Sequence, residues 1–317
     1  MRNGKRWNSL KPVKFGRFVF DNFREKGLLH LLSHAHSDHT SGLKNNWMKA
    51  PILCTDITVE IILTRFNLIP KSIFILKQPG ELVELDDIEI QIVDANHCPG
   101  SVMFSCKSNK SQQKVVFTGD FRLNDNIREN IDQFTNADIM YLDCTFNKPI
   151  FQFPSQNQAI SEVINIIEKN SNQNINIGVY SIGKNKLIQA ISEHFTTRIY
   201  TPKKLYDVYK AIGMNKFVTT KKSNAWIRSY PRHYMERKTL EIDGVVKIIP
   251  TGWACINRSN PENHFYYVPY SEHNDYNLLN EFIRLTKPKK IVPIHGKLNP
   301  ISTRFINNQE NKYQATL

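Results

Sequence analysis

Cysteine is scarce in this 317-residue chain, and the five cysteines that are present are scattered along it. No two of them form a CxxC pair, and an odd number cannot all be joined in disulfides. This usage argues against a disulfide framework and against a zinc-thiolate site, and it fits a reducing compartment.

Long apolar runs are also missing. No stretch approaches the roughly 20 apolar residues that a membrane-spanning helix needs, so we do not expect an integral membrane protein. The first twenty residues carry six Lys or Arg and no acid, but no apolar segment follows them. A secretory signal is therefore not expected, and a mitochondrial presequence is a minor alternative.

Acidic residues are outnumbered. The chain has 29 Asp and Glu against 42 Lys and Arg, a net charge of +13 and a pI near 9.4. Between Lys184 and Lys238 thirteen Lys or Arg face only three acids. Such a surface attracts polyanions such as nucleic acids, although a solvated face in a Lys- and Asn-rich chain would look the same. Charge alone does not decide between them.

Histidine is concentrated in one stretch, which reads LLSHAHSDHTSGL. Three imidazoles and a carboxylate fall within six residues there: His34, His36, Asp38 and His39. A polar turn with incidental histidines would not explain this grouping beside an apolar run. The pattern predicts metal binding, provided that further ligands follow later in the chain.

The local geometry of this stretch suggests two metal positions. The run Leu28 to Ser33 suits a buried strand, and alternate side chains of an extended chain project to the same side. His34 and His36 can therefore hold one cation together. Asp38 and His39 fall in a turn into an expected helix, so they would face a second cation.

Further ligands stand where later strands are expected to end. His97 follows the predicted strand Ile88 to Asp94, and Asp120 follows the predicted strand Val115 to Phe117. His97 alone would more often be structural, but the first two histidines need a third ligand, and Asp120 could bridge two cations. Such a pair polarises a phosphate and stabilises a leaving oxygen. Imidazole and oxygen ligands suit one or two Zn²⁺ ions, with Mn²⁺, Fe or Mg²⁺ as alternatives.

Two more carboxylates end predicted strands. Asp21 follows the predicted strand Phe15 to Phe20, and Asp143 follows Ile139 to Leu142. Asp21 is either a loop cap or a group that orients a histidine ligand. From Pro154 onward, strands and helices alternate, which favours a parallel α/β unit.

These motifs resemble a known family. HAHSDH, NHCPG and TGD are similar to the ligand motifs of the metallo-β-lactamase fold. DANHCPGS, FTGDFR, YLDCTF, FPSQ, YSIGK, PTGW and VPYSEH resemble the Artemis/Apollo-type DNA cross-link repair nucleases, from about Phe15 to about His295. The resemblance implies an α/β protein, a four-layer αβ/βα sandwich with an inserted α/β β-CASP domain. The domains would be 1–152, 153–262 and 263–317, with the active site at their seam.

The resemblance also implies roles for individual residues. The first metal would be held by His34, His36, His97 and Asp120, and the second by Asp38, His39 and Asp120. A hydroxide activated by the two metals would attack the phosphodiester. The residues implied in catalysis are Asp38, Asp120, Asp143 as the β-CASP motif A acid, and His273 as the motif B histidine that protonates the departing 3′ oxygen.

A phosphate-binding corner is expected at YSIGK, where a strand, a tight turn and a helix start would expose backbone N–H groups. Family members place a terminal-phosphate pocket nearby, which makes Thr145, Ser181, Lys184 and Ser271 candidates. Such a pocket would favour digestion from a 5′-phosphorylated end. The basic stretch would hold the strand without regard to sequence.

One residue departs from the family pattern. His295 stands at β-CASP motif C, where the DNA-acting members usually carry valine and RNA-processing members carry histidine. It could complete the second metal site, and it puts a DNA-only substrate in doubt.

The expected function is a metal-dependent 5′-to-3′ DNA exonuclease, with structure-specific endonuclease activity as a variant, in cross-link or double-strand-break repair. Its partners would be single-stranded or 5′-phosphorylated DNA, and RNA under the alternative of a β-CASP ribonuclease. A non-catalytic DNA-binding scaffold is a third reading, and a small-molecule hydrolase a fourth. We expect a monomer in the nucleus, with the mitochondrion and cytoplasm as alternatives.

Overall fold

The computed structural model describes residues 12–235 and 244–300. The chain divides into two units: unit 1 contains residues 1–147 and 277–317, and unit 2 contains residues 148–276. The end of the basic stretch, from Glu236 to Lys238, and four of the six N-terminal basic residues lie outside the described residues. The domain boundaries given by the resemblance remain a prediction.

The first sheet of unit 1 has five strands in sequential order. They are β1 (Val13–Phe15), β2 (Phe18–Phe20), β3 (Leu29–Leu31), β4 (Ile52–Cys54) and β5 (Phe74–Leu76). Only the β1–β2 pair is antiparallel. The single strand predicted from Phe15 to Phe20 is therefore wrong. Gly16, with φ of +57°, reverses the chain between two short strands.

The second sheet of unit 1 has six strands in the order β17-β10-β9-β8-β7-β6. They are β6 (Leu82–Leu85), β7 (Ile88–Asp94), β8 (Val102–Ser108), β9 (Lys114–Phe117), β10 (Ile139–Cys144) and β17 (Ile291–Gly296). β17 is the last strand of the described residues. It pairs in parallel with β10, although the two strands are far apart in the sequence.

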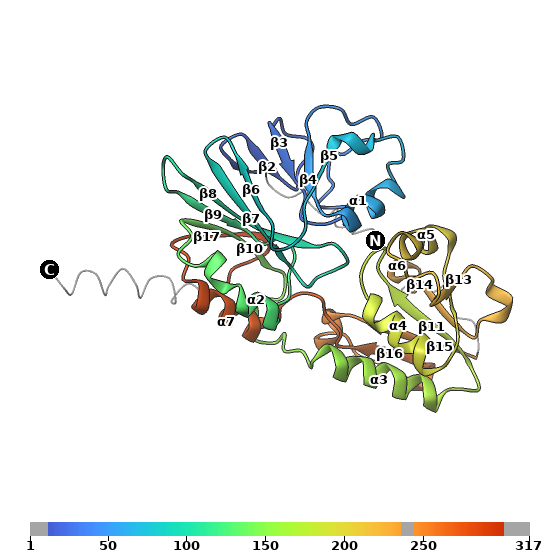
Figure 1. The fold of residues 1–317 in the computed structure, drawn as a ribbon. Coiled ribbons are helices and arrows are strands. Elements are labelled where there is room, and N and C mark those ends of the chain that lie inside the picture. The colour runs from blue at the N-terminus through green and yellow to red at the C-terminus, as the bar shows by residue number, and fades with distance from the viewer. Residues whose placement is uncertain (1–11, 236–243, 301–317) are drawn as a thin grey trace, which may run out of the picture. The chain divides into compact units, whose positions relative to one another are not determined.

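Apolar side chains from both sheets form one core layer in unit 1, with Phe20 stacked on Phe117 at a ring distance of 4.9 Å. A second apolar layer covers the other face of the six-stranded sheet. It includes Ile127 of α2 (Asp125–Glu129), Phe134 and Phe282 of α7 (Tyr276–Thr286), and the rings of Phe134 and Phe282 are in contact. Figure 1 shows these two helices along that sheet. The helix α1 (Asp56–Leu63) follows β4.

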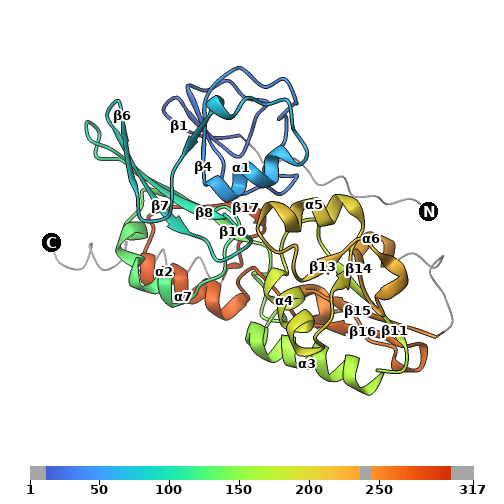
Figure 2. The same cartoon turned by 45° about the vertical axis from the view of Figure 1, so that its right-hand side comes forward.

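Unit 2 is an α/β layer around a parallel sheet, in the order β13-β12-β14-β11-β15-β16. Its strands are β11 (Asn174–Val179), β12 (Ile199–Tyr200), β13 (Val218–Thr219), β14 (Ile227–Pro231), β15 (Val245–Pro250) and β16 (Phe265–Val268). Its helices are α3 (Gln156–Lys169), α4 (Asn185–His194), α5 (Lys203–Ala211) and α6 (Arg232–Met235). α3 packs beside α4 (Figure 2).

The helices of unit 2 begin where local chemistry allows. Ser155 caps α3 in a reciprocal capping box with Gln158, which satisfies two backbone N–H groups at the helix start. The apolar faces of α3 and α4 bury Val163 and Ile188 against the sheet residue Ile177. The predicted fold class, a metallo-β-lactamase sandwich carrying an α/β insert, is confirmed. Among the residues described, no helix is both long and apolar enough to cross a membrane.

Candidate metal centre

The buried carboxylate of Asp21 orients residues of the centre through hydrogen bonds. Asp21 follows β2 and accepts three hydrogen bonds: from the Ser33 N–H at 2.7 Å, the Ser33 hydroxyl at 2.5 Å and His39 Nδ1 at 2.6 Å. Because a carboxylate only accepts, Nδ1 of His39 carries its proton there, and Nε2 is turned toward the centre. Asp21 thus acts as the sequence suggested, by orienting a histidine.

The same network sets the orientation of His34. The hydroxyl hydrogen of Ser33 is committed to Asp21, so its oxygen accepts from Nδ1 of His34 at 2.9 Å. Nε2 of His34 is therefore left with its lone pair, as a metal ligand requires. Sequence reasoning did not single out Ser33. Its position directly before the first histidine was the available signal.

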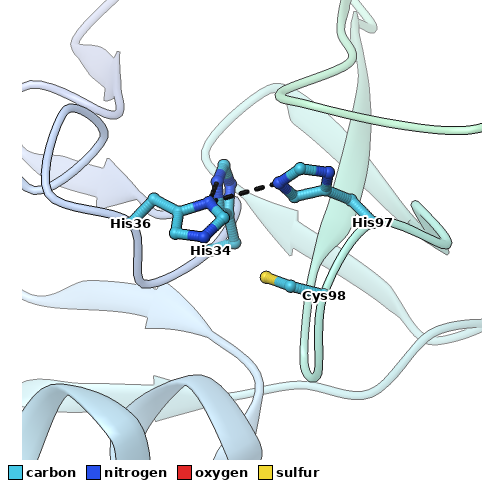
Figure 3. A group of neighbouring side chains, drawn as sticks. All are labelled: His34, His36, His97 and Cys98. Atoms are coloured by element: carbon cyan, nitrogen blue, oxygen red, sulfur yellow. Dashed lines mark hydrogen bonds between the residues drawn. The ribbon is translucent and has the colours of Figure 1, made fainter. Parts of the chain in front are cut away.

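Three imidazoles converge at the first metal position (Figure 3). Nδ1 of His36 lies 2.8 Å from Nε2 of His34 and 3.2 Å from Nε2 of His97. Oδ2 of Asp120 lies 3.7 Å from His34 and 3.5 Å from His97. Cys98, which the sequence did not predict as a ligand, presents its sulfur to the same group within 4.8 Å.

A second group of donors adjoins the first. His295 Nε2 lies 3.1 Å from His39 Nε2 and 3.7 Å from Asp38 Oδ2. Oδ1 of Asp120 is 3.4 Å from each of the two imidazole nitrogens. Asp120 therefore directs one oxygen toward each group of histidines, which is the arrangement that a bridging carboxylate has.

Strand pairing explains how His295 reaches this position. β17 runs parallel to β10, and His295 stands opposite Asp143 in the register, after an irregularity between Leu142 and Asp143. The carboxyl ends of two parallel strands meet at one edge of a sheet, so both residues arrive there together. Asp143 is buried and accepts from the backbone N–H of Thr145 at 3.0 Å and from its hydroxyl at 2.6 Å.

A tight turn presents His97. Asn96 takes a left-handed conformation with φ of +50°. The Ser101 hydroxyl accepts the N–H groups of His97 and Cys98, at 3.2 and 3.1 Å. Gly100, with φ of +77°, lets the turn approach α1, where a side chain would meet the Thr58 amide. These contacts fix the backbone of the turn that carries His97.

The helix expected after His39 is absent, and that prediction is wrong. Residues 37–42 form turns, in which Thr40 N–H donates to His36 O and the Thr40 hydroxyl donates back to His36 O and Ser37 O. This side chain competes for carbonyls that a helix would use, and Gly42 at φ of +91° ends the turn. Nothing in the sequence singled out Arg65, whose guanidinium donates a hydrogen bond to the Ala35 carbonyl inside this loop.

The pKa values of the two buried histidines, His34 and His39, shift in opposite directions. Burial lowers the pKa of His34 well below its ordinary value, and the neighbouring His39 and His36 add to that effect. Burial also lowers the pKa of His39, but the carboxylates of Asp120 and Asp21 outweigh it, and the net pKa is well above the ordinary value. Negative charge at the centre thus favours a cation beside His39.

The donor set fits divalent metal. Imidazole nitrogens and carboxylate oxygens are the ligands that zinc and related cations take in hydrolytic sites, and they converge here from several strand ends. Two imidazoles have their outer nitrogens held by hydrogen bonds, as metal-ligating histidines usually do.

Comparisons with known proteins find similar families and relatives. A family model described as DNA repair metallo-beta-lactamase matches residues 207–295. DNA ligase 6 of Arabidopsis thaliana is 29% identical over 96% of this chain, and the 5′ exonuclease Apollo of Danio rerio is 29% identical over 88%. These matches support the DNA repair metallo-β-lactamase family, which the sequence motifs resemble.

A further relative is also a DNA repair protein by name. The DNA cross-link repair 1A protein of Homo sapiens is 27% identical over 89% of the chain. The chain spans 24%, 50% and 30% of the lengths of these three relatives, in the order given. A solved protein of unknown function from Enterococcus faecalis V583 shares the fold, with a TM-score of 0.60 and 16% identity over 86% of this chain and 76% of that one.

The remaining predicted residues belong to unit 2. Ser271 Oγ accepts the N–H of His273 at 3.0 Å. Ser181 is exposed, whereas Lys184 is buried and takes a left-handed conformation with φ of +58° before α4. The N–H of Lys184, which a phosphate corner would need free, donates to the Glu272 carboxylate at 2.5 Å. That N–H group therefore has a protein partner, and the phosphate-binding corner as a whole stays a prediction.

Proposed function

We propose that this chain is a metal-dependent phosphodiesterase, a 5′-to-3′ DNA exonuclease of cross-link or double-strand-break repair. The observation that carries the proposal is the convergence of His34, His36 and His97 on one side of Asp120 and of His39 and His295 on the other. The names of two relatives, a 5′ exonuclease and a DNA cross-link repair protein, support the choice of substrate.

The proposed metal ligands are His34, His36, His97 and Asp120 at the first position and Asp38, His39, Asp120 and His295 at the second. Divalent cations, Zn²⁺ foremost, would supply Lewis acidity toward a phosphodiester and toward water. Asp21 and Ser33 hold two of the imidazoles in the tautomer that leaves Nε2 as the ligand atom. The protein thus holds the Nε2 lone pairs of His34 and His39 in fixed orientations for metal binding.

Proton transfer is assigned to two further residues. Asp143, whose carboxylate is held by two hydrogen bonds from Thr145, is proposed as an acidic member of the catalytic set. His273 is proposed as the general acid that protonates the departing 3′ oxygen, and its backbone is fixed through Ser271. Thr145, Ser181, Lys184 and Ser271 are proposed to contact substrate phosphates. The proposed location is the nucleus, and the proposed state is a monomer.

The test is a nuclease assay on end-labelled single strands and hairpins, with 5′-phosphate and 5′-hydroxyl ends, in the presence and absence of chelator. Asp120→Asn should abolish hydrolysis, because the amide cannot bridge two cations as a carboxylate does. Asp125→Asn, which changes an exposed acid of α2, is the matched control and should leave activity intact. Full activity of Asp120→Asn, or of wild-type protein in chelator, would rule out the mechanism.

A second candidate function is a β-CASP ribonuclease, and His295 is the observation that favours it. Its Nε2 lies within 3.7 Å of Asp38 and 3.4 Å of Asp120, as a ligand of the second cation would. Matched DNA and RNA strands separate the two candidates, and His295→Val should reduce RNA cleavage more than DNA cleavage if RNA is the substrate. A non-catalytic DNA-binding scaffold would be supported by purified protein that holds no metal.

A further inference from the structure

The parallel sheet of unit 2 has two faces of different chemistry. One face is apolar and packs against α3 and α4, and Ile177 of β11 belongs to that core. Successive side chains of a strand point to opposite faces, so Asn176 of β11 points to the second face. The residues that stand beside Asn176 in the register of the sheet therefore form a row across that second face.

The register identifies the members of this row. Asn176 pairs with Arg228 of β14 on one side and with Lys247 of β15 on the other. Arg228 pairs in turn with Tyr200 of β12, and Lys247 pairs with Phe265 of β16. We call these residues the Arg228 row (Tyr200, Arg228, Asn176, Lys247 and Phe265). Neighbouring strands lie about 4.8 Å apart, so the row extends over roughly 19 Å and is long enough for a few nucleotides.

The two cations of the Arg228 row have no counter-ion among the residues that the structure describes. The ammonium of Lys247 forms no hydrogen bond or ion pair with any of them. Arg228 donates from Nε to the Ala225 carbonyl at 2.9 Å, which holds the guanidinium in place and leaves its two amino groups for a ligand. Both side chains are partly exposed. Such a pair of cations attracts a polyanion.

The amide between the two cations also lacks a partner. Asn176 is only 6% exposed, and in the described part of the chain its Oδ1 accepts no hydrogen bond. A buried acceptor without a donor is costly, so a ligand that brings an N–H group to the row would be favoured. The amino groups of nucleobases are donors of this kind.

Aromatic rings stand at both ends of the Arg228 row. The ring of Tyr200 lies 5.7 Å from that of Tyr230, and the ring of Phe265 lies 5.1 Å from that of Tyr267. All four residues are partly exposed. Partly exposed rings on a sheet, with cations between them, are the features with which proteins bind single strands: the bases stack on the rings and the phosphates meet the cations.

We propose that the Arg228 row binds a single-stranded segment of nucleic acid, through residues that belong neither to the metal centre nor to the predicted phosphate corner. Tyr200 and Phe265 stack on bases, and Arg228 and Lys247 contact the phosphates between them. The choice of a nucleic acid as ligand rests on the proposed function. Because stacking needs unpaired bases, the row selects single strands over duplexes.

The experiment measures fluorescence anisotropy of the full chain with a labelled DNA single strand in chelator, over a range of salt concentrations. Lys247→Gln should reduce the slope of log affinity against log salt by about 0.7, the value for one phosphate contact on a single strand. Phe265→Leu keeps an apolar side chain but removes the ring. It should weaken binding by roughly tenfold, as loss of one stacked base does, and leave the salt slope unchanged.

Each variant has a matched control. Lys204→Gln removes a positive charge from an exposed position of α5, and Phe66→Leu removes a partly exposed ring from unit 1. Circular dichroism checks that every variant is folded. The proposal is overturned if Lys247→Gln has the salt slope of Lys204→Gln, or if Phe265→Leu has the affinity of Phe66→Leu. An equal loss by Phe265→Leu on a blunt duplex would also overturn it, because paired bases cannot stack on the ring.

Cleavage in metal separates this proposal from the proposed function. Binding that depends on Lys247 and Phe265 as expected, in a wild type that cleaves no strand, would reject the proposed function alone. Cleavage by a wild type whose binding is insensitive to both substitutions would reject the Arg228 row alone.

Discussion

Nε2 of His295 lies 3.1 Å from Nε2 of His39, although the two residues are 256 positions apart in the chain. His39 comes from the loop after β3, and His295 from β17, which pairs with β10. Both nitrogens are 3.4 Å from the same oxygen of Asp120. Two imidazole nitrogens and a carboxylate oxygen at such distances are the arrangement expected around a shared cation, which supports the proposal that His295 is a ligand.

Replacing His295 by valine should therefore remove the second cation. The expected metal content, measured by mass spectrometry after buffer exchange, falls from two ions per chain toward one, because Asp38 and His39 are left with only a shared carboxylate. The first position should keep its ion. His194→Gln, which alters an exposed histidine paired with Glu168, serves as the control. Two ions retained by His295→Val would show that this residue is not a ligand.

Asp21 should matter to metal affinity without touching the metal. Asp21→Asn keeps the size of the side chain, but one of its terminal atoms becomes a donor and cannot accept from His39 Nδ1 or the Ser33 hydroxyl. We expect the affinity for Zn²⁺, measured by chelator competition, to fall by roughly 10- to 100-fold. Asp87→Asn, which removes a carboxylate that accepts from Ser108 elsewhere in unit 1, should leave it unchanged. Equal affinities would mean that the loop alone orients His39.

The proposed metal ligands of the first position could be predicted because two of them are close together in sequence and the other two follow predictable strands. His34 and His36 are two residues apart in an extended segment, and His97 and Asp120 each follow a strand that the apolar pattern identifies. The network behind them could not be predicted. Ser33 carries out its role only because Asp21, twelve residues earlier, is brought against it by the pairing of β2 and β3.

The errors in the fold have local physical causes. The helix expected after His39 fails because the Thr40 side chain bonds to the carbonyls of His36 and Ser37. β8, which was not predicted, is buried on both faces, so its sequence does not alternate between apolar and polar residues.

Gly119 should be essential to the centre for a steric reason. Its φ is +51°, and a Cβ there would lie 2.6 Å from the Ser33 hydroxyl oxygen and 2.7 Å from the Ser33 Cβ. Gly119→Ala should therefore push Ser33 away from Asp21 and His34 and lower both thermal stability and Zn²⁺ affinity.

Gly80→Ala is a matched control for this substitution. Gly80 also has a positive φ, of +91°, but a Cβ there meets no atom within 4 Å. That variant should lose only the roughly 1–2 kcal/mol that a left-handed conformation costs an L-residue, with Zn²⁺ affinity unchanged. If the two alanine variants bind Zn²⁺ equally well, the contact between Gly119 and Ser33 does not support the centre.

His30 should make the stability of the protein depend on pH. Its ring stacks on Phe23 at 5.0 Å, meets the edge of Trp47 at 5.0 Å, and donates from Nδ1 to the Asn22 carbonyl at 3.1 Å. Burial lowers the pKa of His30 from 6.5 to about 4. The hydrogen bond to the Asn22 carbonyl opposes this shift, and the nearby Lys49 adds to it. The folded protein thus keeps His30 neutral where the unfolded chain would protonate it.

The sign of the effect follows from proton binding. Between pH 6.5 and about 4 the unfolded chain binds a proton at His30 that the folded protein does not, so stability falls as the pH is lowered through that range. The variant His30→Phe can retain the stacking but has no titrating group. The free energy of unfolding of the wild type, measured relative to this variant by urea denaturation, should decrease by about 3 kcal/mol from pH 7.5 to pH 4. A difference that stays constant with pH would show that folding does not lower the pKa of His30.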